Sequence, residues 1–232
     1  MTSPPLFLHE EALLLALCDE RGKPDSTTWF PQAMAAGVLS DLILAGRLAT
    51  EGPEDAPTVR VIDSSPLGHE LIDSWLETLA KEREPQVLSL CLQGIAADPN
   101  LHERVADSLA ARGILERVED TVLLIFRRVR YPEADAGPEQ AIRRRLRSAL
   151  FEPEAEVDAH TVALLAIARA TELLPLVFAA PDLQSHAERL DALCSGEWAS
   201  SAVQASLDSI GTTVAITTAA VTAAVVVPIV TR

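Results

Sequence analysis

The run from His160 to Ala180 constrains the fold most, because apolar side chains lie all around the helix that it predicts. These side chains are Val162, Leu164, Leu165, Ile167, Leu173, Leu174, Val177 and Phe178. A helix without a polar face is stable in water only when other elements cover it on all sides. We therefore expect this helix at the centre of the domain, with the other elements packed around it.

Apolar residues recur at helical spacing in most of the remaining chain. The predicted helices are 7–18, 30–45, 64–84, 85–97, 100–112, a helix ending near Phe151, and 183–193. Ser64, Ser65 and Pro66 predict the start of the third helix, and Gly46 and Gly113 predict two helix ends. Residues 47–49 and 59–62 alternate around a polar turn and predict a small hairpin. The fold class is mainly α: one domain over residues 1–232 around a central apolar helix, with one or two short β-hairpins.

A second β-hairpin is predicted within residues 113–132. A short apolar run ending at Val118 meets the acidic pair Glu119-Asp120, which we interpret as the turn. The following run is apolar on both faces and consists of Val122, Leu123, Leu124, Ile125 and Phe126. Such a strand is either buried on both sides or exposed for a purpose, such as membrane insertion or self-association.

Arginines are concentrated around this hairpin in a chain of net charge −15. Seven of them lie between Arg127 and Arg147, against three acidic residues. Basic residues near an anionic bilayer each contribute about 1 kcal/mol to binding. The candidate lipid-binding arginines are Arg127, Arg128, Arg130, Arg143, Arg144 and Arg147. The alternative is a solvated helix face paired with the neighbouring acids.

The acidic charge argues against general nucleic-acid binding, which requires a basic field. A winged helix is a second interpretation of residues 101–112 and the hairpin, but Arg104 and Arg112 are offset there by Glu103 and Asp107. We therefore expect no nucleic-acid partner. The three cysteines are far apart and suit a reduced, cytoplasmic protein.

Sequence motifs of catalysis are absent: there is no G-x-S-x-G, phosphate-binding loop, G-x-G-x-x-G or H-E-x-x-H. His9, Glu10 and Glu11 could supply metal ligands, but we interpret them as the polar first turn of a helix. We expect a binding protein that is not an enzyme and has no cofactor or metal ion.

The segment from 209 to 231 has no charged residue and is long enough to span a bilayer. It consists mainly of Ala, Val and Thr, which favour insertion only weakly. We interpret it as a buried apolar C-terminal helix, with membrane contact as the alternative.

The chain resembles the Golgi phosphoprotein 3 family, and the resemblance extends in order over nearly its whole length. The segments that carry it are LFLHEEALLLALCDERG, the AGRL that closes the second helix, LHERVADSLAARGIL, TVLLIF, AIRRRLRSAL and VDAHTVALLAIARATELLPLVF. The resemblance implies a mostly helical domain that binds membranes peripherally through phosphatidylinositol 4-phosphate. It also implies that the apolar hairpin inserts into the bilayer or mediates self-association, and that a membrane protein is a client.

The same resemblance implies a headgroup pocket with one tryptophan and three arginines. Trp29 matches the tryptophan, with a small shift in loop length, and His102 falls on one arginine position. The other two positions fall on Pro99 and on Ala35 or Ala36. The alanine-rich composition and short loops suggest a bacterial member, whose host offers other anionic lipids.

Taken together, these patterns predict a cytoplasmic protein that is peripheral on the inner face of a membrane. It would bind an anionic phospholipid of phosphoinositide type through Trp29, His102 and the candidate arginines, and contact the bilayer through residues 122–126. The alternative is a protein–protein interaction module in which the hairpin forms an oligomer interface without lipid.

Overall fold

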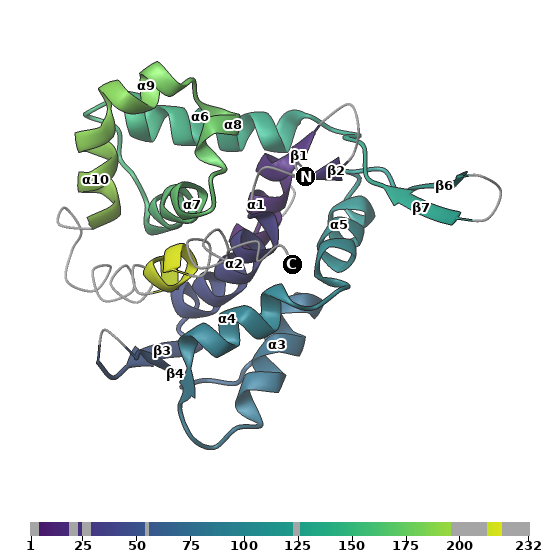
Figure 1. Cartoon of the computed structure of the whole chain (residues 1–232), viewed down its shortest axis with the longest axis vertical. Coiled ribbons are helices and arrows are strands. Elements are labelled where there is room, and N and C mark those ends of the chain that lie inside the picture. Colours follow the sequence, from purple (N-terminus) through teal and green to yellow (C-terminus); the bar gives the residue numbers. More distant parts are fainter. Residues whose placement is uncertain are drawn as a thin grey trace, which may run out of the picture.

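Two buried helices, α1 (Leu8–Ala16) and α2 (Phe30–Leu44), run side by side through the middle of the molecule (Figure 1). The computed structural model describes residues 5–18, 23–24, 29–53, 56–122, 126–195 and 213–219. All nine residues of α1 are buried, and so are eleven consecutive residues of α2, from Ala33 to Ile43. These helices lack the polar stripe that a surface helix requires, so other elements must cover them.

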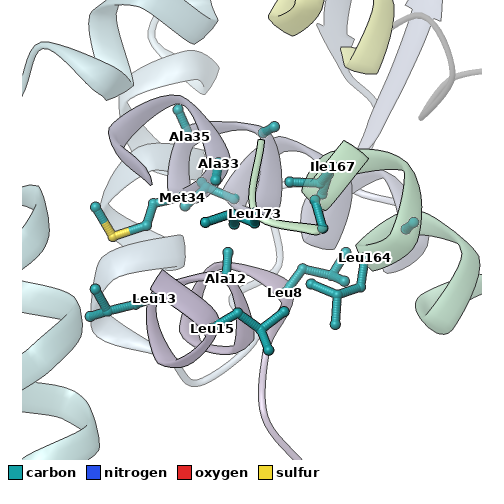
Figure 2. Close-up of a cluster of buried hydrophobic side chains, with 14 of the residues drawn as sticks. Leu8, Ala12, Leu13, Leu15, Ala33, Met34, Ala35, Leu164, Ile167 and Leu173 are labelled. Atoms are coloured by element: carbon teal, nitrogen blue, oxygen red, sulfur yellow. The ribbon is translucent and has the colours of Figure 1, made fainter. Parts of the chain in front are cut away.

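The core is built where α7 (Ala159–Ala170) packs on this pair. Figure 2 shows leucine and alanine side chains of α1 and α2 pointing toward Leu164 and Ile167 of α7, with Leu173 entering from the chain that follows. Small alanines such as Ala12 and Ala33 let the backbones approach closely, and the leucines fill the space between them. The helix predicted at the centre is therefore central, but it shares that place with α1 and α2.

The remaining helices form two groups on either side of this core (Figure 1). One group holds α3 (Glu70–Ala80), α4 (Leu88–Ala96) and α5 (Leu101–Ala111). The other holds α6 (Gly137–Phe151), α8 (Leu174–Val177), α9 (Ala180–Ser185) and α10 (Ala187–Ser195). A further helical segment spans 213–219, where Thr213 and Thr217 are buried and three residues are exposed. The rest of the predicted C-terminal helix 209–231 lies outside the described part.

The strands form three small antiparallel sheets. Strand β1 (Leu17–Cys18) pairs with β2 (Lys23–Pro24). Strand β3 (Leu48–Glu51) pairs with β4 (Thr58–Val61), which continues to β5 (Gln86–Val87). The third sheet is the hairpin of β6 (Val118–Val122) and β7 (Phe126–Arg130). The mainly α fold and both predicted hairpins are confirmed.

Three of the predicted helices have wrong boundaries. The predicted helix 183–193 is divided at His186 between α9 and α10. The third helix begins at Glu70, because the backbone N–H groups of Leu67 and Gly68 donate to the Asp73 carboxylate and hold the preceding chain in a turn. The predicted helix 160–180 ends at Ala170, and Glu172 then adopts a left-handed conformation with φ of 60°. Pro175 starts α8, since proline fits the first turn of a helix but not its interior.

The closest approach between α1 and α2 is at Gly37. A Cβ atom there would lie 2.6 Å from the backbone nitrogen of His9 and 2.7 Å from its Cα. Backbone atoms of a fully buried helix cannot move away without disturbing the core. We expect Gly37→Ala to lower the free energy of unfolding by about 1–3 kcal/mol, measured by urea denaturation.

Gly94 provides the matched control for this substitution. It lies inside α4, and a Cβ atom there meets no other atom within 4 Å. Gly94→Ala should raise the free energy of unfolding by about 0.5–1 kcal/mol, because alanine is the better helix former. If the two variants changed stability equally, the close packing of α1 on α2 at Gly37 would be disproved.

Candidate functional site

The β6–β7 hairpin extends away from the helical body next to α5 (Figure 1). The sequence interpretation placed the turn at Glu119-Asp120, and this is wrong: both acids lie within β6, and residues 123–125 connect the two strands. The observed register sets Asp120 opposite Arg128 and Val122 opposite Phe126.

The apolar residues assigned to membrane contact are therefore concentrated at the end of the hairpin. Val122 and Phe126 are the last residues of its two strands. Leu123, Leu124 and Ile125 lie outside the described residues, as do the side chains of Val122 and Phe126. In the order of the chain, all five belong to the stretch that joins the ends of β6 and β7.

The base of the hairpin is fixed to the body by buried and charged contacts. Ile114, Leu115 and Tyr131 are buried in the core, and Leu115 forms a further bridge with Glu133. Arg117 donates to both oxygens of Asp107 on α5, at 2.6 and 2.7 Å. These contacts fix the direction in which the hairpin projects.

The predicted lipid-binding arginines do not form one surface. Arg143 donates to Glu139 and to the carbonyl of Leu176, 3.0 Å away, so it joins α6 to α8. Arg144 and Arg147 are exposed and lie one turn apart on α6, where Arg147 covers the ring of Phe151.

On the hairpin, Arg130 is partly buried at the end of β7. The side chains of Arg127 and Arg128 lie outside the described part of the chain. On α6, Arg144 and Arg147 are thus the two arginines best placed to meet a charged partner.

Trp29 and His102 lie near each other, at the start of α2 and of α5. The backbone N–H of Trp29 donates to the backbone carbonyl of Thr171 at 3.2 Å. The His102 ring packs edge to face against the rings of Phe30 and Tyr131. Burial lowers the pKa of His102 and outweighs the opposing charges of nearby carboxylates. The imidazole is therefore neutral near pH 7 and would offer a phosphate at most one N–H.

A cluster of buried charges surrounds α1, where the sequence had suggested only a polar first turn. His9 and Glu10 are 0% exposed and Glu11 is 3% exposed. Each has a different partner: His9 binds Asp41, Glu10 binds Arg112, and Glu11 binds Arg145 and His160. Buried charges are stable only when they are paired in this way.

Glu10 has the most complete set of partners in this cluster. Its Oε1 accepts from Ser108, and its Oε2 accepts from Arg112 and the Phe7 N–H. His69 Nε2 lies 3.5 Å from Oε1. Burial by itself raises the pKa of Glu10, but these hydrogen bonds and the nearby positive charges outweigh it and lower the pKa to about 2.

Ser108, His69 and Glu10 bring a hydroxyl, an imidazole and a carboxylate together, but not in the geometry of a catalytic triad. Ser108 and Glu10 both approach the same ring nitrogen of His69, Nε2, at 3.2 and 3.5 Å. In a triad the acid binds one ring nitrogen and the nucleophile binds the other. The three groups are therefore arranged to satisfy a buried carboxylate.

Comparison with protein families gives a match over residues 8–210 to the model described as Golgi phosphoprotein 3 (GPP34). The chain belongs to the Golgi phosphoprotein 3 family. A search of curated proteins finds no match. The family model begins at the first residue of α1 and includes the buried cluster, both hairpins and α10, so the resemblance seen in the sequence is confirmed.

The arginine positions that the resemblance implies fall on different parts of the described structure. Ala35 and Ala36 are fully buried in α2, so a long charged side chain would have no room there. Pro99 is exposed just before α5. Among the described residues, no helix is both long and apolar enough to cross a membrane.

Sequence reasoning missed the buried cluster because its members come from five helices and the chain preceding α3. One signal was present: Glu10 and Glu11 interrupt a helix whose remaining positions are nearly all apolar. When a helix is covered on all sides, its charged residues are buried together with its apolar ones. The partners that neutralise them, such as Arg112 and Arg145, could be found only from the packing.

His160 gives this cluster a measurable pH dependence. Burial lowers the pKa of His160, but the hydrogen bond and charge of Glu11 outweigh it, and the folded pKa lies above 6.5. The stabilisation is therefore complete below pH 6.5 and is lost as the pH rises through the folded pKa. We expect His160→Gln to cost roughly 1–2 kcal/mol at pH 6 and less at pH 9, in urea denaturation at both pH values.

His186→Gln is the control for that measurement. His186 also packs on aromatic and backbone groups, but it binds no carboxylate in the described structure. Its substitution should change stability to the same extent at both pH values. A pH-independent effect of His160→Gln would refute the role of the Glu11 contact.

Proposed function

We propose that the protein is a peripheral membrane protein that binds anionic phospholipid, on the cytoplasmic face of a membrane. The observation that carries the proposal is the β6–β7 hairpin, which projects from the body and has its most apolar sequence at the far end. Five consecutive large apolar residues between the two strands of a hairpin are typical of a segment that a membrane or a partner covers. Membership of the Golgi phosphoprotein 3 family supports this assignment.

Arginines on the hairpin and, separately, on α6 support an anionic partner. Strand β7 carries Arg127, Arg128 and Arg130, and α6 has the exposed Arg144 and Arg147 on another part of the molecule. Phosphates that bind these arginines would be held mainly by charge, since the arginine positions that the resemblance implies fall on Pro99, His102 and Ala35 or Ala36 in this chain. We therefore propose recognition of anionic lipid as a class, with little selectivity for one phosphoinositide.

Vesicle co-sedimentation tests this proposal. Binding to vesicles containing cardiolipin or phosphatidylglycerol is expected, with little binding to neutral vesicles and weakening at high salt. Arg144→Gln/Arg147→Gln should reduce binding on the order of tenfold, because each arginine near an anionic surface contributes about 1 kcal/mol. A strong preference for phosphatidylinositol 4-phosphate would contradict recognition by class.

Lys81→Gln/Arg83→Gln is the matched control, because it removes the same charge from exposed positions after α3. Helix α3 lies at the opposite end of the molecule from α6 (Figure 1). Binding should change little in this variant. Equal losses in the two double variants would show that only net charge matters and that α6 is not the contact surface.

Self-association through the hairpin is the second candidate function, supported by the same apolar end. Two copies of the hairpin could bury residues 122–126 against each other without lipid. Analytical ultracentrifugation in the absence of vesicles distinguishes the two: a monomer that sediments with anionic vesicles supports membrane contact. An oligomer that never sediments with vesicles supports the interface.

A further inference from the structure

A cavity of about 630 Å³ opens on the side of the molecule where α6 and α7 meet the ends of α1 and α2. Its walls are mainly apolar, and they include Leu6, Phe7, Leu44, Pro138, Ala141 and Ile142. Its volume falls within the range of small-molecule sites, which combine apolar walls with a few convergent polar groups. Neither the hairpin nor the proposed lipid contact on α6 accounts for it.

The polar groups of this cavity are charged and belong to the buried cluster. The carboxylates of Glu11, Asp41 and Asp158 line it, together with the cations Arg145 and His160. Glu11 is 3% exposed and lies deepest, whereas Asp158 is exposed before α7. Three carboxylates face two cations, so the cavity carries a net negative charge even with His160 protonated.

The hydrogen bonds of these groups leave two acceptors available. Arg145 and His160 both donate to Glu11 Oε2, at 2.6 and 3.0 Å. Asp158 Oδ1 accepts from the Thr161 N–H at 2.7 Å and caps α7. The Thr161 hydroxyl also donates to the Asp158 carboxylate. In the described part of the chain no donor reaches Glu11 Oε1, and a carboxylate has about four lone-pair sites, so Asp158 can accept a further hydrogen bond.

Asp41 is different, because both of its carboxylate oxygens already accept hydrogen bonds from α1. It accepts from the Leu8 N–H at the start of α1 and from His9 Nδ1, both at 3.0 Å. Its charge adds to the negative potential of the cavity, but its oxygens are already used. A ligand would therefore meet Glu11 and Asp158.

We propose that this cavity binds a small amphipathic amine, whose ammonium group is held by Glu11 and Asp158 and whose apolar body lies against α6 and the chain before α1. An ammonium group supplies three donors and the positive charge that the cavity lacks. The apolar body would replace water along walls that gain nothing from hydration. An anion would instead meet three carboxylates at close range, which costs free energy.

A matched series of ligands tests the charge requirement. Hexylamine, hexanol and hexanoate have the same apolar chain and differ only in the polar end. We expect hexylamine to raise the thermal unfolding midpoint in proportion to its concentration and to bind by isothermal titration calorimetry. Hexanol should have a smaller effect, and hexanoate none.

Two substitutions test the location. Ala141 is exposed on α6 and lines the cavity, so Ala141→Trp should fill it and abolish binding of hexylamine. Asp158→Asn keeps the helix cap, because asparagine caps as well as aspartate, but removes the charge. It should weaken binding about threefold to fivefold, as expected for a partly exposed charge pair.

Glu154→Gln is the matched control, because Glu154 is an exposed acid of the same linker that does not line the cavity. It should leave binding of hexylamine unchanged. Circular dichroism shows whether each variant is folded. If Ala141→Trp does not fold, Asp158→Asn still tests the location of the site.

Three results would overturn the proposal. The first is the absence of any stabilisation by hexylamine. The second is equal or stronger binding of hexanoate, which Arg145 could hold because its Nε has no partner in the described structure. The third is unchanged binding of hexylamine to both Asp158→Asn and a folded Ala141→Trp variant.

Discussion

Replacing Glu10 by glutamine is expected to lower the free energy of unfolding by roughly 3 kcal/mol at pH 7. The side chain keeps its shape but loses its charge, and its new N–H₂ group faces donors from Arg112 and the Phe7 backbone. Glu10 is 0% exposed, so water cannot compensate for the lost contacts. Urea denaturation of the two proteins measures the difference.

The same carboxylate should make the protein sensitive to acid. The folded pKa of Glu10 is about 2, below its ordinary value of 4.5, so the unfolded chain binds the proton more tightly. Its stabilisation is therefore complete above pH 4.5 and is lost as the pH falls toward 2. This pKa difference corresponds to about 3 kcal/mol, in agreement with the expected cost of Glu10→Gln.

Glu70→Gln provides the control for both measurements. Glu70 is an exposed acid in the first turn of α3, where its charge favours the helix end, and no ion pair joins it to another residue of the described structure. This variant should lose well under 1 kcal/mol. If Glu10→Gln cost no more than Glu70→Gln, or if its stability fell as steeply in acid as that of the original protein, the importance of the buried cluster would be disproved.

The second large effect is expected at the end of the hairpin. Leu123→Asp/Leu124→Asp should abolish binding to anionic vesicles, with a loss of at least a hundredfold. Burial of each leucine in the bilayer is worth roughly 1.5–3 kcal/mol, and each new aspartate is repelled by the lipid phosphates. Vesicle co-sedimentation at low salt measures the loss.

Ile62→Asp/Leu90→Asp is the matched control for this variant. Ile62 and Leu90 are 51% and 64% exposed; Ile62 directly follows β4 and Leu90 lies in α4. Both elements lie away from the β6–β7 hairpin (Figure 1). Their replacement adds the same two charges and removes the same kind of side chain. Binding should be unchanged, and an equal loss would show that added negative charge alone prevents contact.

The oligomeric state of the hairpin variant separates the two candidate functions. Loss of vesicle binding in a protein that is monomeric before and after substitution favours insertion. Loss of an oligomer with vesicle binding intact would assign residues 122–126 to a subunit interface instead. Sedimentation velocity of the same preparations gives this result.

Much of the fold could be predicted because it depends on local patterns. The α2 helix was found to within one residue from its apolar spacing, and Gly46 and Gly113 do have the positive φ that ends a helix in glycine. The β3–β4 hairpin followed from alternation around a polar turn. The turn of the β6–β7 hairpin was misplaced, because its register depends on which residues face each other across the strands.

The candidate site was predicted only in part, for the same reason. The apolar run 122–126 and the arginines are visible as composition. However, a sequence cannot show that Arg143 is used inside the protein while Arg144 next to it is exposed. That difference arises because neighbouring residues on a helix point in directions about 100° apart, and the packing of α8 decides which one is covered.

The sequence by itself determined the mainly helical fold, the family and the apolar hairpin, because each depends on residue order and local periodicity. Only the tertiary structure decided whether the charged residues of α1 are buried and which residues pair with them. His9, Glu10 and Glu11 read as an ordinary polar turn, yet packing buries them and brings Asp41, Arg112 and Arg145 to them from distant parts of the chain. The physical reason is that a buried charge requires a partner within a few ångströms, and such distances are fixed by how helices pack.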